Sequence, residues 1–181
     1  LSNITIPPIQ EDDLLSLSIE VLDIDDHNLS LSVTEIDDIS ITLDNTILTN
    51  SGIIQWITIY PDSDWYGSRS GLINVSDGEY SDSQQIIINV ESVNDAPIIN
   101  TISNQIVLED ESIDIFIDGE DIDGDEIIYS VISSGNYSTS IIGNTLSINP
   151  DENYNGELEL LVEASDGYVN SQSSFYLNVQ P

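Results

Sequence analysis

The sequence of 181 residues contains no cysteine and no lysine, and it has a single arginine, Arg69. Without cysteine, no disulfide can hold the fold and no thiolate can act as a nucleophile or soft-metal ligand. The 34 Asp and Glu residues give a formal net charge of −33. This charge excludes nucleic acid and anionic membrane surfaces as partners, because both need Lys and Arg to neutralise phosphate. It points instead to cations.

Catalytic groups and membrane-spanning runs are also lacking. The only histidine is His27, and neither a Ser-His pair, a Cys-His pair nor a Gly-rich phosphate loop is recognisable. Carboxylates suited to glycoside hydrolysis are abundant, but the loop sites described below account for them. No apolar run approaches the roughly 20 residues that span a bilayer. We therefore expect neither an enzyme nor membrane insertion. The start at Leu1, without a recognisable signal segment, is typical of a mature or excised piece.

Alternating apolar and polar residues recur along the chain. The alternation is clearest in "LSLSIEV" (residues 15–21), "IDIFI" (113–117) and "LELLVEA" (158–164). A period of two with many β-branched Ile residues indicates half-buried strands. Turn-forming stretches such as "SDGEYSD" and "SSGNYS" separate the runs. The pattern predicts an all-β sandwich fold.

The chain also repeats itself. Residues 11–26, "EDDLLSLSIEVLDIDD", match residues 109–124, "EDESIDIFIDGEDIDG". Residues 61–67, "PDSDWYG", match residues 150–156, "PDENYNG", and an "SDG" stands at 76–78 and again at 165–167. We therefore predict two homologous domains, 1–95 and 96–181. The first offset is 98 and the others are 89, so the first domain has nine extra residues between Asp26 and Pro61. We expect them in a longer hairpin around "LDNTILTNSG".

The motifs resemble a known family. A strand ending in "VNDAP" (93–97), an upstream "PDxxYxG" element, an "SDG" turn and a "DxDGD" loop (121–125) are similar to the cadherin-like tandem repeats of bacterial and archaeal surface proteins. The resemblance covers nearly the whole chain. It implies two tandem Greek-key, cadherin-like or Ig-like β-sandwich domains with calcium at their junction. It also implies an extracellular, cell-surface location.

The acidic loop is consistent with calcium on chemical grounds. Ca²⁺ takes six to eight hard oxygen ligands, and Asp121, Asp123 and Asp125 are spaced two residues apart around Gly124. Carboxylates about 4 Å apart repel by roughly 1 kcal/mol per pair in water and about 4 kcal/mol at an effective dielectric near 20. An EF-hand is a poor interpretation, because Glu126 stands at the sixth position of the loop and the flanks read as strands.

The resemblance implies a set of calcium ligands, residue by residue. At the junction they are Glu11, Asp62 and Asp64 from the first domain, Asn94 and Asp95 from the linker, and Asp121, Asp123, Asp125 and Asp166 from the second domain. Incomplete half-sites are expected at the outer ends, with Asp23, Asp25 and Asp77 at one and Glu109 and Asp151 at the other. His27 departs from the pattern, because it stands where the second repeat has Asp125. Pro97 is expected to stiffen entry into the next strand.

Two classes of function remain open. The first is a calcium-stiffened structural module of a surface adhesin or of a self-assembling fibre, with copies of itself or neighbouring repeats as end-to-end partners. Such assembly would use the outer half-sites, and the apolar segment Leu1 to Ile9 could add to a neighbouring sheet edge. The second is an adhesion module that binds a glycan or a protein. Trp56, Trp65, Tyr66 and Tyr154 are the candidate stacking residues, although aromatic residues in a sandwich mostly belong to the core. Surface hydration, as in halophiles, is the competing explanation of the charge.

Overall fold

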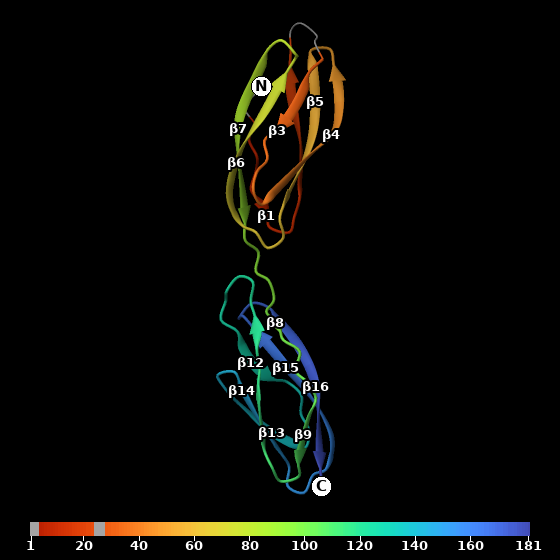
Figure 1. The fold of residues 1–181 in the computed structure, drawn as a ribbon, viewed down its shortest axis with the longest axis vertical. Coiled ribbons are helices and arrows are strands. Elements are labelled where there is room, and N and C mark those ends of the chain that lie inside the picture. The colour runs from red at the N-terminus through yellow and green to blue at the C-terminus, as the bar shows by residue number, and fades with distance from the viewer. Residues whose placement is uncertain (1–3, 24–27) are drawn as a thin grey trace. The chain divides into compact units, whose positions relative to one another are not determined.

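The residues that the structure describes form strands and the loops between them (Figure 1). The computed structural model describes residues 4–23 and 28–181. Among these residues, none forms a helix long and apolar enough to span a membrane. The chain divides into two compact units, Leu1–Val93 and Asn94–Pro181, two residues before the boundary expected from the repeat motif.

The first unit is a sandwich of a four-stranded and a three-stranded sheet, ordered β1-β7-β6-β3 and β2-β5-β4. The strands of the larger sheet are β1 (Ile9–Gln10), β7 (Ser81–Glu91), β6 (Gly67–Ser76) and β3 (Ser30–Val33). Those of the smaller sheet are β2 (Leu15–Leu22), β5 (Gly52–Pro61) and β4 (Ile39–Thr49). Strand β1 runs parallel to β7, and the other pairs are antiparallel.

The second unit repeats this topology, with sheets ordered β9-β16-β15-β12 and β10-β14-β13. The larger sheet contains β9 (Gln105–Leu108), β16 (Asn170–Gln180), β15 (Gly156–Ser165) and β12 (Ile128–Val131). The smaller sheet contains β10 (Ile113–Phe116), β14 (Thr145–Pro150) and β13 (Tyr137–Ile142), and a short pair joins β8 (Ile98–Ile99) to β11 (Gly119–Glu120). The all-β fold of two tandem Greek-key sandwiches is confirmed.

Each unit has its own hydrophobic core. Ile57 and Ile59 of β5 are fully buried in the first unit, and Leu146 and Ile148 of β14 are fully buried in the second. Along β15, the side chains of Leu158 and the alternate residues after it point inward, while the acids between them are more exposed. The period-two pattern of the sequence is therefore the pattern of burial.

The extra residues of the first unit lie in one hairpin. The β4–β5 pairing runs from Ile39 to Pro61, whereas the matching β13–β14 pairing runs from Tyr137 to Pro150, which is nine residues shorter. A bulge interrupts the longer hairpin between Leu43 and Thr46. The predicted position of the insertion is thus confirmed. A bulge of this kind twists an edge strand and weakens its pairing with other chains.

The glycine of the "PDxxYxG" element has a steric reason in both units. Gly67 and Gly156 have φ angles of 138° and 140°, which L side chains rarely adopt. A Cβ atom on Gly67 would lie 3.3 Å from the Trp65 ring, and one on Gly156 would lie 3.1 Å from the Tyr154 hydroxyl. The aromatic residue of the element is therefore folded back against its own glycine.

Candidate metal centre

The residues that follow Val93 are tied to loops of the second unit. The Asn94 side chain donates a hydrogen bond from Nδ2 to Asp166 Oδ2 at 2.7 Å. The backbone N–H of Asp95 donates to Asp123 Oδ2 at 2.9 Å. The structure thus brings together four of the residues that the sequence predicts as ligands, all at one end of the second unit. Their role as metal ligands stays a prediction.

The acidic loop of the second unit is organised around Asp121. Its Oδ1 atom accepts hydrogen bonds from the backbone N–H groups of Asp123, at 3.0 Å, and Asp125, at 3.3 Å. Gly124 has a φ angle of 79°, so a glycine suits the tight turn. The other oxygen, Asp121 Oδ2, is buried and has no hydrogen-bond partner among the described residues. A buried carboxylate oxygen without a partner is unfavourable by about 1–3 kcal/mol or more.

Asp166 is held by the "SDG" turn. Its Oδ1 atom accepts hydrogen bonds from the N–H groups of Tyr168, at 2.6 Å, and Val169, at 2.7 Å. The hydrogen bond from the Asn94 side chain, with those from the two backbone groups, lowers the pKa of Asp166, although partial desolvation opposes the shift. The carboxylate therefore stays ionised, and negative, at neutral pH.

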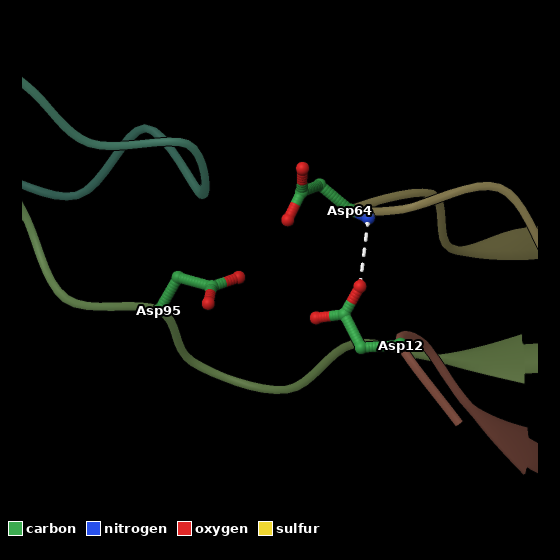
Figure 2. A group of neighbouring side chains, drawn as sticks. All are labelled: Asp12, Asp64 and Asp95. Atoms are coloured by element: carbon green, nitrogen blue, oxygen red, sulfur yellow. Dashed lines mark hydrogen bonds between the residues drawn. The ribbon is translucent and has the colours of Figure 1, made fainter.

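In the first unit, acids gather where the segment after β1 meets the "PDxx" turn. Glu11 is only 3% exposed; its N–H donates to Glu91 O at 2.9 Å, and its Oε1 accepts from the N–H of Val93 at 2.6 Å. Asp12 Oδ1 accepts from the N–H of Asp64 at 3.2 Å (Figure 2). The carboxylates of Asp12 and Asp64 have oxygen atoms within 4.8 Å of each other. Two like charges at this distance repel unless a cation or water lies between them.

Asp62 is placed differently from the other two predicted acids of this end. Its backbone N–H donates to Asp38 O at 2.8 Å, and its carbonyl accepts from the N–H of Trp65 at 3.3 Å, so these backbone contacts of Asp62 are those of a turn. Its side chain is exposed. Figure 2 also draws Asp95, which belongs to the second unit and whose N–H bond to Asp123 is described above.

Asp12 is a residue that the sequence analysis missed. Its counterpart in the second unit, Asp110, accepts a hydrogen bond from the N–H of Asn153 at 2.8 Å, just as Asp12 does from Asp64. All four residues have positive φ angles, between 56° and 64°. The available signal was the alignment of "EDD" with "EDE" at the offset of 98 that relates residues 11–26 to residues 109–124. The recurrence in both units assigns these acids a structural role in joining two turns.

The half-site predicted at the outer end of the first unit includes Asp23 and Asp77, which belong to the residues that the structure describes. Asp77 repeats the turn of Asp166, because its Oδ1 accepts from the N–H groups of Glu79 and Tyr80 at 2.7 and 2.6 Å. Asp23 donates its N–H to Ser51 O at 2.8 Å. Asp25 and His27 lie outside the described residues.

At the far end of the second unit, two predicted acids are held through their backbone N–H groups. Glu109 donates to Gln180 O at 2.6 Å, and Asp151 donates to Asn136 O at 2.8 Å. Glu109 is half-buried and Asp151 is exposed.

The donor chemistry of the two acidic ends fits calcium. The side chains are carboxylates and one amide, which supply the hard oxygen atoms that Ca²⁺ prefers. The buried, unpartnered oxygen of Asp121 is the atom that a cation would satisfy. A zinc or copper site would instead need His or Cys, and the chain has one His and no Cys.

Comparison with known proteins supports the fold. Residues 94–176 match the family model of the bacterial Ig domain. Human protocadherin-24 EC1-2 is similar over 100% of this chain and 96% of its own, with 16% identity and a TM-score of 0.55. The protocadherin γB4 extracellular domain matches 98% of this chain and 31% of its own, with 13% identity and a TM-score of 0.52. The two units are therefore Ig-like and cadherin-like repeats in fold.

More distant likenesses add no argument about activity. An endo-fucoidan hydrolase of glycoside hydrolase family 107 matches 98% of this chain, with 19% identity and a TM-score of 0.41. The chain spans 28% of the length of that enzyme. No curated protein matches the sequence.

The link between Asn94 and Asp166 gives a test by titration. The pKa of Asp166 is lowered in the folded state, so its charge stabilises the fold above the unfolded pKa, and this contribution is lost as pH falls through the folded value. In Asn94→Ala the pKa of Asp166 should rise toward its ordinary value. Carbon-detected NMR titration of the Asp166 carboxyl, in chelator, measures the change.

A matched control removes a different side-chain amide. Asn100→Ala deletes the hydrogen bond from Asn100 to Asp118 and should leave the titration of Asp166 unchanged. An Asp166 titration that is the same in Asn94→Ala and in the unaltered protein would show that the linker does not hold this carboxylate.

Proposed function

We propose that the chain is a calcium-stiffened, extracellular structural module, a building block of a cell-surface adhesin or of a self-assembling fibre. The observation that carries the proposal is the Asp121 carboxylate, one oxygen of which binds its own loop while the other is buried without a partner. Asp123 of the same loop accepts a hydrogen bond from the N–H of the linker residue Asp95, and Asp166 accepts one from the side chain of Asn94. A cation at Asp121 Oδ2 relieves both the missing hydrogen bond and the repulsion among these charges.

The linker connects the two acidic ends covalently. Glu11 of the first unit binds the backbone nitrogen of Val93, and Asp123 of the second binds that of Asp95. Two residues of chain span at most about 7 Å. In the proposal, a calcium ion held by the loop of Asp121 also binds oxygen atoms of the linker, which restricts the rotation of the linker.

Calcium binding also contributes to the stability of the folded state. A ligand that binds only the folded form stabilises it by about 2.7 kcal/mol when its concentration is 100 times its Kd. Without the cation, Asp121 and Asp166 are held by backbone N–H groups and, for Asp166, by the Asn94 side chain. We therefore infer that the isolated chain is least stable in chelator.

An extracellular, non-enzymatic role is consistent with the fold. Bacterial Ig domains and cadherin-like domains are generally extracellular, and folds of this kind typically have no catalytic function. Extracellular modules bind calcium with Kd values of about 0.1–1 mM, which suits a medium with millimolar calcium. The scarcity of His, Lys and Cys supports the same conclusion.

The proposed partners are copies of this chain, or neighbouring repeats, arranged end to end. The first unit has the same "SDG" turn at Asp77 that binds the linker through Asp166 in the second unit. By this analogy, the turn at Asp77 takes an Asn-Asp segment of a neighbouring repeat. A head-to-tail contact of this type does not close on itself and favours a filament over a dimer.

Thermal unfolding tests the calcium site. Millimolar Ca²⁺ should raise the Tm and chelator should lower it, by roughly 4–8 °C for each 1 kcal/mol of stabilisation in a domain of this size. Asp121→Asn keeps the shape of the side chain but removes its charge, so it should lose most of the calcium-dependent shift. Circular dichroism over a calcium titration measures both effects.

The control is a charge change away from the loops. Glu159→Gln removes one exposed acid on β15 and should keep the full response to calcium. A Tm that ignores calcium and chelator but rises in molar NaCl would contradict the proposal and favour hydration of an acidic surface.

Sedimentation tests the partner proposal. In chelator the highly charged chains should repel each other and remain monomeric, whereas millimolar Ca²⁺ should produce species that grow with protein concentration. Asp77→Asn should reduce this growth, and Glu159→Gln should not. A strict monomer at millimolar Ca²⁺ would contradict self-assembly and leave only a role within a longer covalent chain.

A further inference from the structure

The outer face of the smaller sheet in the first unit exposes two aromatic rings. Trp56 is 41% exposed and Tyr60 is 40% exposed, whereas Ile57 and Ile59 beside them on β5 are fully buried. Trp56 and Tyr60 therefore point away from the core, on the face opposite to the buried isoleucines. By contrast, Trp65 packs against the core of this unit. Core packing thus accounts for Trp65 but not for the two outward rings.

Polar groups are fixed between the two rings. Thr58 lies midway between Trp56 and Tyr60 on the same face and is only 6% exposed. Its hydroxyl donates to Asp44 Oδ2 at 2.6 Å and lies 2.8 Å from the Ser16 hydroxyl. Asp44 also accepts a hydrogen bond from the Thr42 hydroxyl at 3.0 Å. The result is an exposed carboxylate in a fixed position with lone pairs to spare.

The two outward rings of β5 are special to the first unit. The repeat offset of 89 aligns Trp56 with Thr145 and Tyr60 with Asn149, so the second unit has no aromatic residue at either position. Asp44 stands at the bulge of the hairpin that carries the nine extra residues. The second unit does have a hydroxyl–carboxylate pair, since Ser147, which matches Thr58, donates to Asp114 Oδ1 at 2.6 Å. The rings are thus the feature by which this face of the first unit departs from the common repeat. A purely structural repeat does not require this departure.

We propose that this aromatic face, made of Ser16, Thr42, Asp44, Trp56, Thr58 and Tyr60, binds an uncharged polysaccharide. The apolar faces of pyranose rings stack on aromatic side chains, while fixed polar groups bind the sugar hydroxyls. Trp56 and Tyr60 are four residues apart on one strand, about 13 Å, which suits an extended glycan rather than a single sugar.

The charge of the chain determines which glycan can bind. A net charge of −33 repels sulfated and uronic-acid polymers, so an uncharged polymer is the ligand that the face accepts. The proposal goes beyond the structural role and does not depend on the calcium ligands.

Affinity electrophoresis of the full chain tests the proposal. Native gels containing a soluble β-glucan, a galactomannan or, as the anionic case, alginate are run at one fixed calcium concentration. We expect retardation by at least one of the two neutral polymers and none by alginate. Trp56→Ala should weaken the binding at least tenfold, and Tyr60→Ser should weaken it as well.

The second unit provides a matched control. Phe116 is 69% exposed on the outer face of β10, so Phe116→Ala removes an exposed ring of similar size and should leave retardation unchanged. All variants are compared by Tm at the same calcium concentration, and Tyr60→Ser replaces Trp56→Ala if the latter unfolds. The proposal is overturned if neither neutral polymer retards the chain, if Phe116→Ala loses binding equally, or if only alginate binds.

Discussion

The repulsion between carboxylates is the constraint on which the rest of this molecule depends. The chain has 34 acids and one Arg, so it cannot neutralise its acids with its own cations. Arg69, on β6, pairs with Asp38 and lies 4.5 Å from the centre of the Trp65 ring, so the one Arg of the chain neutralises a single acid of the first unit. The described acids of the loops depend on N–H and hydroxyl donors, or on a cation from solution.

The repeated sandwich places these acids at the ends of each unit. In both units a "PDxx" turn is joined to the segment after the first edge strand through an Asp residue, Asp12 or Asp110. The linker then contacts the second unit through Asn94 and Asp95. The same loops therefore determine both the shape of the fold and the sites at which charge accumulates. The nine extra residues of the first unit lie in the β4–β5 hairpin, where they change one sheet face.

Much of the fold follows from local sequence signals. Period-two alternation predicts the strands, because one face of each sheet must be buried, and self-alignment predicts two units and the position of the longer hairpin. The joining role of Asp12 was not predictable by such means, since it depends on a contact between residues 52 positions apart. The sequence also did not predict that Trp56 is exposed while Trp65 packs against the core. The register of β5 turns Trp56 outward, whereas Trp65 lies in the loop that follows β5 and packs against the core.

The most direct test is the freedom of the linker with and without calcium. The natural chain has no cysteine, so two introduced cysteines carry spin labels at unique places. Ser70→Cys and Ser130→Cys lie at exposed positions of the first and second unit. Pulsed electron resonance should give a narrow distance distribution in millimolar Ca²⁺ and a broad one in chelator, and Asp121→Asn should stay broad in both. A distribution of equal width in calcium and in chelator would contradict calcium stiffening.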